Sequence, residues 1–321
     1  MPQRESFKPC SEPVFGKATS AISDRVNRLL NSKMKNSSYV LVTPVRDEQA
    51  TIAVTIESVV RQTIKPVEWV IVSDQSTDRT EEIVEEHASK HSFIRLLRLT
   101  HRPGRNFGSV VFATESGIAE LKIKDYPFIG LLDGDIRLPE NYYEELLRRF
   151  EADPRLGLAG GLAVDCYGGR RYPSLQSLSD VAGAVQFYRR ECFEALGGLV
   201  AVPEGGWDAI TCVQARMHGF RTRTFPEIEV DHLKPRNVAE GNTIRRTWQL
   251  GVREYALGNH PLFELAKCAY RCFERPFVLS GCLRLAGYSW CCLNRKGRML
   301  PGDIMRFLRK EQMRRIFGRI W

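Results

Sequence analysis

Two alternating patterns of hydrophobic and polar positions run along the chain from residue 39 onward. Short apolar runs, typical of strands buried on both faces, alternate with stretches in which apolar residues recur every three or four positions, as in amphipathic helices. Strands are predicted at YVLVTPV, EWVIVSD, FIRLLRL, FIGLLDGD and LGLAGGLAV, and helices at 50–62, 78–91, 107–122 and 139–151. This alternation predicts right-handed βαβ units and an α/β fold whose doubly wound, mostly parallel central sheet is flanked by helices.

The pattern changes near residue 238, where helical stretches follow one another without strands. They lie at 242–258, 262–274, 277–293 and 302–319. At the other end, prolines and polar residues dominate until a short helical stretch at 21–33. We therefore predict a mobile N-terminal tail and short helix over 1–38, an α/β domain over 39–235, and a helical, basic C-terminal region over 236–321.

Basic residues are concentrated in the C-terminal region. The whole chain has 47 Lys and Arg against 38 Asp and Glu, a net charge of +9. From Arg236 onward there are 17 basic and 6 acidic residues, a balance of +11, so residues 1–235 carry −2. A solvated helix face, nucleic acid and an anionic membrane surface are the three interpretations of such a region. The membrane surface fits best, because apolar side chains accompany the cations of 302–319, namely Phe307, Leu308, Ile316, Phe317 and Trp321.

Composition and cysteine spacing indicate a folded, reduced, cytoplasmic protein. Hydrophobic residues make up 43% and charged residues 26% of the chain, which excludes a wholly disordered or collagen-like protein. The nine cysteines include no Cys-x-x-Cys pair, so we expect reduced thiols. The first residues lack an apolar signal core, and the longest apolar run, 277–293, has Arg284 in its middle. We therefore expect neither export nor a membrane span.

An acidic triplet, Asp133-Gly134-Asp135, follows the apolar run FIGLL. In open α/β sheets, ligands bind outside the carboxyl ends of the strands. Two carboxylates with a glycine between them offer hard oxygen ligands and room for a bulky anion, which suits Mg²⁺ or Mn²⁺ bound together with phosphates. An Asp-Gly turn explains the same triplet without any ligand, and the triplet alone leaves both interpretations open.

Four more polar residues are candidates for chemistry or for local structure. Asp74 follows a predicted strand, where its carboxylate could accept a hydrogen bond from a nucleobase N–H. Asp78 with Glu81 instead predicts a capping box for a helix that begins at Arg79. Asp208, in the segment GGWD, is either a general base that deprotonates a hydroxyl or a helix N-cap. His232 is either a third metal ligand or a structural histidine.

Several of these segments together resemble a known family. TPVRDE, VSDQSTDRT, LLDGD and GGWD are similar to the successive motifs of family 2 glycosyltransferases, which have the GT-A fold. RRECFEALGG, TRTFPEIEVDH and GNHPLF resemble the non-processive bacterial members, and the resemblance covers residues 39–263. It implies that the α/β domain has a donor half over 39–138 and an acceptor half over 139–235.

The resemblance also implies a nucleotide-sugar donor at the strand ends. In the implied arrangement the nucleoside lies against Pro44 and Glu48, and the base contacts Asp74. Asp133 contacts the ribose or the metal. A Mn²⁺ or Mg²⁺ ion that bridges the diphosphate binds Asp135, with Asp133 and His232 as further ligands. Ser73 stands where many relatives have aspartate, and Gln75 where they have glycine. The resemblance therefore specifies the base less closely than the fold.

Further implied roles lie around the phosphates and the acceptor. Asp208 occupies the place of the family's catalytic base. Arg105, ahead of the helix 107–122, could bind the donor phosphates, because a guanidinium and a helix N-terminus both suit that anion. A solvated surface arginine is the alternative for Arg105. Gly160, Gly161 and Trp207 are expected on the acceptor side.

These inferences predict an inverting, metal-dependent glycosyltransferase. It would move one sugar from a nucleotide-sugar, expected to be UDP-linked, to a hydroxyl of a glycan or lipid-linked acceptor in envelope or exopolysaccharide synthesis. It would lie on the cytoplasmic face of the membrane through its C-terminal helix, with no nucleic-acid partner. One alternative is a catalytically idle protein of this fold that binds membrane or nucleic acid through the basic region. Another is a sugar-nucleotide nucleotidyltransferase, which would need a glycine-rich phosphate loop that PVRDEQATI lacks.

Overall fold

Five segments of the chain are described by the structure, a computed structural model. They are residues 37–100, 108–173, 177–234, 243–272 and 278–318. The predicted tail and the helix at 21–33 lie outside the described residues. The described residues from Tyr39 onward belong to one compact unit.

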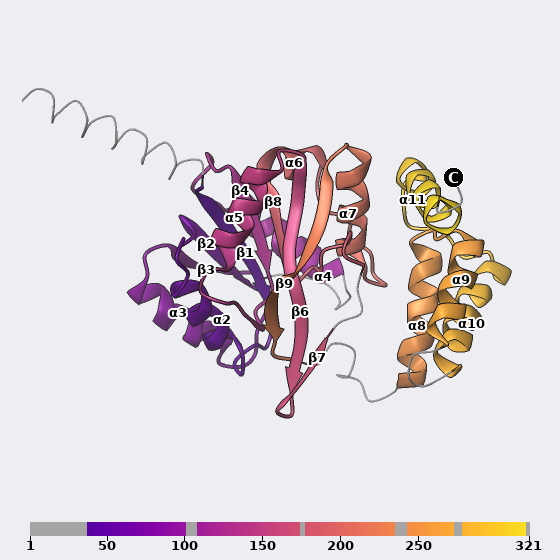
Figure 1. Cartoon of the computed structure of the whole chain (residues 1–321). Helices are drawn as coiled ribbons and strands as arrows, with labels where there is room; N and C mark the ends of the chain where they lie inside the picture. The colour runs from indigo at the N-terminus through magenta and orange to yellow at the C-terminus, as the bar shows by residue number, and fades with distance from the viewer. Residues whose placement is uncertain (1–36, 101–107, 174–176, 235–242, 273–277, 319–321) are drawn as a thin grey trace, which may run out of the picture. The chain divides into compact units, whose positions relative to one another are not determined.

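A nine-stranded sheet organises the described residues, in the order β3-β2-β1-β4-β8-β6-β9-β5, with β7 paired to β6. Four parallel strands correspond to predicted runs: β1 (Tyr39–Val45), β2 (Glu68–Ser73), β3 (Ile94–Arg98) and β4 (Phe128–Leu132). Strand β1 pairs with both β2 and β4 (Figure 1). The carboxyl ends of these three strands therefore lie at one edge of the sheet.

The second half of the sheet is mixed. Strand β6 (Leu156–Tyr167) is parallel to β9 (Arg221–His232), and β8 (Val185–Arg189) is antiparallel to both β4 and β6. Two short strands, β5 (Ile136–Arg137) and β7 (Arg170–Pro173), pair antiparallel with β9 and β6. The sequence pattern does not predict β5 or β7, because runs of two and four residues carry little periodicity, and it does not predict β8 either. The predicted α/β class with flanking helices and a helical C-terminal extension is confirmed, with these antiparallel strands added.

Helices pack on both faces of the sheet. One face carries α2 (Ile52–Val60), α3 (Thr80–Lys90) and α5 (Tyr142–Ala152), and the other carries α4 (Gly108–Ala119), α6 (Arg190–Ala195) and α7 (Trp207–Met217). Alternate residues of β1 divide between the faces. Tyr39 and Leu41 pack with the first set of helices, and Val40 and Val42 pack with the second. Burial on both faces explains why the strand sequences are almost continuously apolar.

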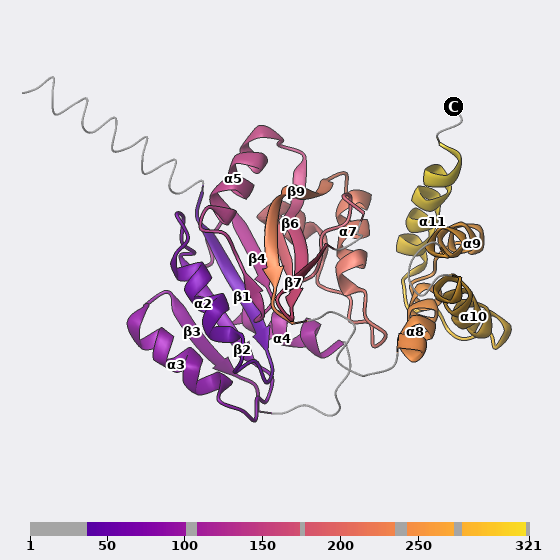
Figure 2. The same cartoon turned by 60° about the horizontal axis from the view of Figure 1, so that its bottom comes forward.

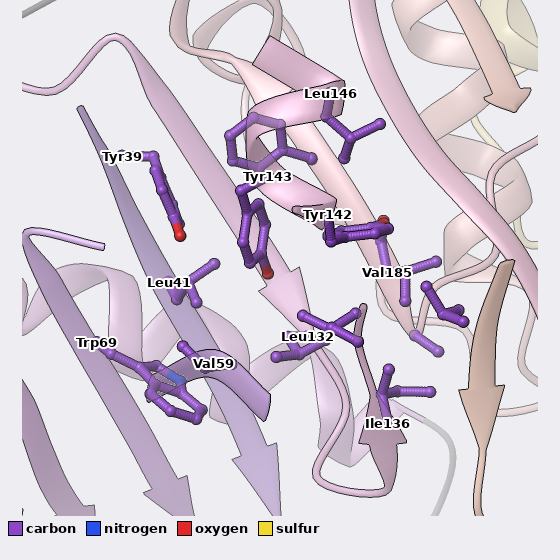
Figure 3. Packing of buried hydrophobic residues seen from close by; sticks show 14 of the residues in the cluster. Tyr39, Leu41, Val59, Trp69, Leu132, Ile136, Tyr142, Tyr143, Leu146 and Val185 are labelled. Atoms are coloured by element: carbon purple, nitrogen blue, oxygen red, sulfur yellow. The ribbon is translucent and has the colours of Figure 1, made fainter. Parts of the chain in front are cut away.

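An aromatic cluster holds β4 and α5 against β1. The rings of Tyr39 and Tyr143 lie 4.5 Å apart between centroids, and Tyr39 meets Phe187 edge-on at 5.5 Å. The Tyr39 hydroxyl donates a hydrogen bond of 2.6 Å to the Ile64 carbonyl. Tyr142 lies beside Tyr143 in the same cluster (Figure 3). Because these rings are buried and closely packed, the residues that follow β4 are placed by a rigid core.

Four helices follow the sheet along the chain: α8 (Thr243–Ala256), α9 (Pro261–Arg271), α10 (Leu279–Leu293) and α11 (Gly302–Phe317). Helix α10 packs against α8 and α9, and α11 contacts α7 and α9. No helix within the described segments has both the length and the apolar character needed to cross a membrane.

The apolar side of α11 is covered by the protein itself. Ile304 is buried in a cluster that includes residues of α7, and Phe307 and Leu308 pack against the same cluster. Phe307 and Leu308 are therefore not free to face a membrane, contrary to the expectation from their sequence pattern. Phe317 is 49% exposed, and Trp321 lies outside the described residues.

Replacement of Gly251 by alanine should destabilise the helices α8 and α10. A Cβ atom at Gly251 would lie 2.0 Å from the Arg284 carbonyl oxygen, whereas one at Gly297 would meet nothing within 4 Å. We expect Gly251→Ala to lower the free energy of unfolding by about 1–3 kcal/mol, since the clash outweighs the better helix propensity of alanine. Gly297→Ala should change it by less than about 0.5 kcal/mol. Urea unfolding followed by tryptophan fluorescence tests this, and equal stabilities of the two variants would contradict it.

Candidate active site

The acidic triplet after β4 is fixed by contacts with both halves of the sheet. The backbone N–H of Asp133 donates to the Ala184 carbonyl at 3.0 Å. The carbonyl of Gly134 accepts from the Thr55 hydroxyl at 2.9 Å, and a Cβ atom at Gly134 would lie 2.7 Å from a methyl group of Val45. The glycine is therefore needed for close packing against β1 and α2, in addition to any role in a turn.

Pairing of β5 with β9 brings the triplet to His232. Ile136 lies opposite His232 in this antiparallel pair, and the Leu233 N–H donates to the Asp135 carbonyl at 2.8 Å. The resulting cluster contains Asp133, Asp135 and His232, whose potential ligand atoms all lie within 4.8 Å of one another. The two-residue strand β5 thus brings Asp135 close to His232, although these residues lie almost a hundred positions apart in the sequence.

The hydrogen bonds of His232 determine which ring nitrogen faces the carboxylates. Its Nδ1 lies within hydrogen-bonding distance of the Lys234 carbonyl, and 3.5 Å from an oxygen of Asp165. A carbonyl only accepts, so Nδ1 carries the hydrogen, and Nε2 of the neutral ring presents a lone pair. This Nε2 is 3.6 Å from Asp135 Oδ2. A cation between the two acceptors would bind both, so the cluster fits a divalent metal ion.

Loops after β1 and β2 form a second polar cluster at the same edge. The Asp47 carboxylate accepts from the Thr77 N–H at 2.8 Å, and the Glu48 N–H donates to the Thr80 hydroxyl at 2.7 Å. Gln75 has a φ of 59°, a left-handed conformation that glycine adopts without strain. This explains why the family pattern has glycine where this chain has glutamine.

Asp74 is buried in this second cluster with an unsatisfied oxygen. Its Oδ2 lies 3.8 Å from Arg46 Nη1, and its Oδ1 has no hydrogen-bond partner among the described residues. Nε of Arg46 is also buried without a hydrogen-bond partner in that part of the chain, and lies 4.0 Å from Asp47 Oδ2. A buried acceptor left unpaired costs about 1–3 kcal/mol, so a ligand N–H at this place would be bound favourably.

Lys234 links Glu48 of the second cluster to the candidate metal site, the cluster of Asp133, Asp135 and His232. The ammonium of Lys234 lies 2.6 Å from Glu48 Oε2, and the Thr51 hydroxyl donates to the same oxygen at 2.6 Å. Burial raises the pKa of Glu48, although the hydrogen bonds from Lys234 and Thr51 oppose this effect. Lys234 therefore contacts Glu48 with its side chain and His232 with its carbonyl.

Pro44, the other residue predicted beside the nucleoside, lies within β1, where it is paired with Val72 of β2.

The local structure around Asp78 differs in part from the capping box. Helix α3 begins at Thr80, whose N–H donates to the Asp78 carboxylate at 3.0 Å. The Glu81 carboxylate accepts from the hydroxyl of Ser73 at 2.6 Å and from Arg98 at 2.7 Å. A capping box also requires Glu81 to bind the backbone at the start of the helix. This part of the prediction is wrong, because the Glu81 side chain binds residues of β2 and β3 instead.

A cavity of about 460 Å³ lies between the candidate metal site and Asp208. Asp133, His232, Trp207 and Asp208 all line it. Asp208 lies in the first turn of α7, where Gly206 occupies the cap position with a φ of 97°. The N-cap interpretation of Asp208 is therefore wrong. Its carboxylate instead accepts from the Gly183 N–H at 3.2 Å and lies at the wall of the cavity.

Helix α8 supplies a cationic wall of the same cavity, which the sequence analysis does not predict. Arg246, Gln249 and Arg253 line it from this side, and Nε of Arg253 is buried without a hydrogen-bond partner among the described residues. The only signal in the sequence is the cluster of arginines next to Trp248. That tryptophan itself lies near Trp290, with ring centroids 6.5 Å apart, as expected for a packing residue.

Two predicted acceptor-side glycines lie inside the sheet, and the predicted phosphate-binding arginine lies outside the described part of the chain. Gly160 and Gly161 lie within β6, where Cβ atoms would come within 2.6 Å of the Val185 carbonyl and 2.4 Å of the Ile228 carbonyl. Packing inside the sheet explains both glycines. Arg105 lies outside the described residues.

Replacement of Asp135 by asparagine should abolish tight binding of Mn²⁺. The substitution keeps the size of the side chain but removes a charged oxygen ligand from the cluster with His232. We expect the dissociation constant of Mn²⁺, measured by electron paramagnetic resonance without any nucleotide, to rise at least about tenfold. Asp153→Asn, at an exposed ion pair with Arg221, is the matched control and should bind as the native chain does. Equal Mn²⁺ affinity for both variants would refute the metal site.

Comparisons with known proteins identify the family of the sheet domain. Residues 40–198 match the model of glycosyl transferase family 2. A 111-residue segment is 27% identical to EpsJ, an uncharacterized glycosyltransferase of Bacillus subtilis strain 168, and covers 35% of this chain. The match spans 30% of the length of that relative.

Two solved structures show the same fold. The mannosyltransferase PcManGT from Pyrobaculum calidifontis, in complex with GDP-Man and Mn²⁺, is similar with a TM-score of 0.50 and 18% identity over 88% of this chain and 87% of that one. TarS 1–349 from S. aureus, in complex with UDP-GlcNAc, is similar with a TM-score of 0.50 and 15% identity over 68% of this chain and 66% of that one. Through its matched segment, residues 40–198, the chain belongs to glycosyl transferase family 2.

Proposed function

We propose that this protein is an inverting, metal-dependent glycosyltransferase. It would transfer one sugar from a nucleotide-sugar to a hydroxyl of a glycan or lipid-linked acceptor. The observation that carries the proposal is that Asp133, His232 and Asp208 line one and the same cavity. Such a cavity holds a donor diphosphate and an acceptor hydroxyl next to each other, as direct transfer requires.

The donor nucleoside would bind over the ends of β1 and β2. The unpaired Asp74 Oδ1 would accept from an imide or amide N–H of the base, and Glu48 and Pro44 would lie beside the nucleoside. We expect a UDP-linked donor. PcManGT and TarS bind GDP-Man and UDP-GlcNAc, so GDP is the competing candidate.

Asp133, Asp135 and His232 would hold a Mn²⁺ or Mg²⁺ ion. When bound, such an ion neutralises the charge that develops on the leaving diphosphate. The chain itself orients the ligands: the Lys234 carbonyl fixes the ring of His232, and the packing around Gly134 fixes the triplet. Arg105 stays a candidate for binding the donor phosphates.

Asp208 would remove the proton from the acceptor hydroxyl as the new C–O bond forms. A hydroxyl is a weak nucleophile at neutral pH, and a carboxylate within hydrogen-bonding distance activates it. The Gly183 N–H holds one oxygen of Asp208, which leaves the other for the acceptor. Direct attack from the face opposite the leaving group inverts the configuration at the anomeric carbon.

The acceptor would lie between Trp207 and α8. Arg246 and Arg253 make this wall of the cavity cationic, which supports an acceptor that carries negative charge, such as a lipid-linked phosphate. Such acceptors belong to envelope or exopolysaccharide synthesis at the cytoplasmic membrane face, and we place the enzyme there. Gly160 and Gly161 would support the acceptor side only through the packing of β6.

A panel of nucleoside diphosphates should identify the base through thermal stabilisation. At a hundredfold excess over its dissociation constant, a ligand stabilises the folded state by about 2.7 kcal/mol. We expect UDP with Mn²⁺ to raise the melting temperature, and Asp74→Asn to lose this response to UDP while it keeps Mn²⁺ binding. Stabilisation by GDP and not by UDP would identify the donor base as guanine instead of uracil. No response to any diphosphate would favour a catalytically idle protein.

Replacement of Asp208 by asparagine should abolish transfer without weakening donor binding. We expect kcat to fall about a hundredfold to ten-thousandfold, because the amide cannot accept the proton. The melting temperature with UDP and Mn²⁺ should rise as in the native chain. Glu204, the neighbouring carboxylate at the cavity, provides the comparison as Glu204→Gln. A larger loss in Glu204→Gln than in Asp208→Asn would assign the base to Glu204 and contradict this mechanism.

A further inference from the structure

Helix α9 exposes its apolar side chains. Leu262 and Leu265 are each 52% exposed, and Tyr270 is 69% exposed. Ala266 and Ala269, also exposed, lie at helical spacing between them. These five residues form a stripe along one side of the helix. A helix that packs on a water-soluble protein normally turns such a stripe toward the core.

The buried side of α9 is charged and polar. Glu264 is fully buried and accepts from the Asn259 amide at 3.0 Å, and Lys267 lies 2.8 Å from Glu254 of α8. Burial and the nearby Glu254 raise the pKa of Glu264. Buried ionic groups stabilise a fold weakly, because desolvation offsets their attraction. Among the described residues, the exposed leucines of α9 therefore contribute little hydrophobic stabilisation.

Helix α10 also exposes large apolar side chains, although it buries Tyr288 and Cys291. Leu279, Trp290 and Leu293 are 44%, 51% and 82% exposed, while Ser280 and Arg284 are buried. Cys282 and Ala286 are also exposed and continue the stripe. The two stripes lie on neighbouring helices, because α9 packs against α10 (Figure 2).

Glycines allow the backbones of α8, α9 and α10 to approach closely. Cβ atoms at Gly251, Gly281 and Gly287 would lie 2.0, 2.4 and 2.4 Å from carbonyl oxygens of a neighbouring helix. Contacts through small residues, together with polar groups inside, are typical of helices whose outer surface meets lipid. The helices thus cohere without burying the two stripes.

Cations accompany the stripes. Arg271 follows Tyr270, and Arg295 and Lys296 follow Leu293, while no acidic residue occurs from 275 to 302. A second copy of the chain placed on this surface would bring like charges together, which is unfavourable. An anionic phospholipid surface matches both the apolar stripes and the cations, because it attracts Lys and Arg side chains that lie near it.

We propose that the exposed stripes of α9 and α10 lie in the headgroup layer of an anionic phospholipid bilayer. The contact is made by α9 and α10 and not by α11, whose Phe307 and Leu308 are covered within the protein. Helix α8 packs against α10 and also lines the cavity through Arg246 and Arg253. Binding of the stripes would therefore hold the cavity next to the membrane surface.

Vesicle binding by the full chain tests this proposal without donor or acceptor, so its failure leaves the proposed transferase activity untouched. The probes are vesicles of phosphatidylcholine with and without phosphatidylglycerol. We expect binding to the anionic vesicles, and a loss of at least about tenfold in the partition constant for Leu262→Ser combined with Leu265→Ser, and separately for Leu293→Ser. Circular dichroism verifies that these exposed positions leave the fold intact.

Two exposed apolar residues outside the stripes serve as controls. Val67 is 40% exposed in the sheet domain and Phe317 is 49% exposed on α11. Val67→Ser and Phe317→Ser should bind vesicles as the native chain does. Native binding by both stripe variants, or loss of binding in Phe317→Ser alone, would overturn the proposal. It would also be overturned if the native chain ignored anionic vesicles and formed dimers that the stripe variants dissociate.

Discussion

The pairing of β5 with β9 is the constraint on which the site depends. It places Ile136 opposite His232 and so brings the Asp135 carboxylate within 3.6 Å of the imidazole. Strand β9 is held in turn by its parallel pairing with β6. Because the triplet is also packed against β1 through Gly134, the two halves of the sheet meet at the acidic cluster. Loss of this short pairing would separate the carboxylates from the histidine.

The C-terminal helices supply part of the wall of the cavity at the edge of the sheet. Helix α8 contributes Arg246, Gln249 and Arg253 to the cavity that contains Asp208, and its other side packs on α10. Helix α8 therefore connects the cavity to α10, one of the two helices of the proposed membrane contact. The ionic interior around Glu254 keeps the apolar side chains of α9 and α10 at the surface. An enzyme that uses a lipid-linked acceptor gains proximity to it from such an arrangement.

The sequence predicts the parallel strands and the acidic triplet well, because buried strands are apolar throughout and their ends are polar. It predicts neither β5 nor β8; β5 has only two residues, too few to show a period. Lys234 and Arg253 are missed for another reason: they reach the site through folding of distant segments, and nothing local marks them. The pattern of 302–319 is amphipathic, but the partner of its apolar side is α7, which only the tertiary structure reveals.

Anomalous diffraction from crystals grown with Mn²⁺ and UDP tests the central claim most directly. We expect a manganese peak within bonding distance of Asp135 and His232, with the diphosphate on the side that faces Asp208. The uracil should lie against Asp74. A peak at another group of ligands, or a diphosphate bound away from the cavity, would contradict the account.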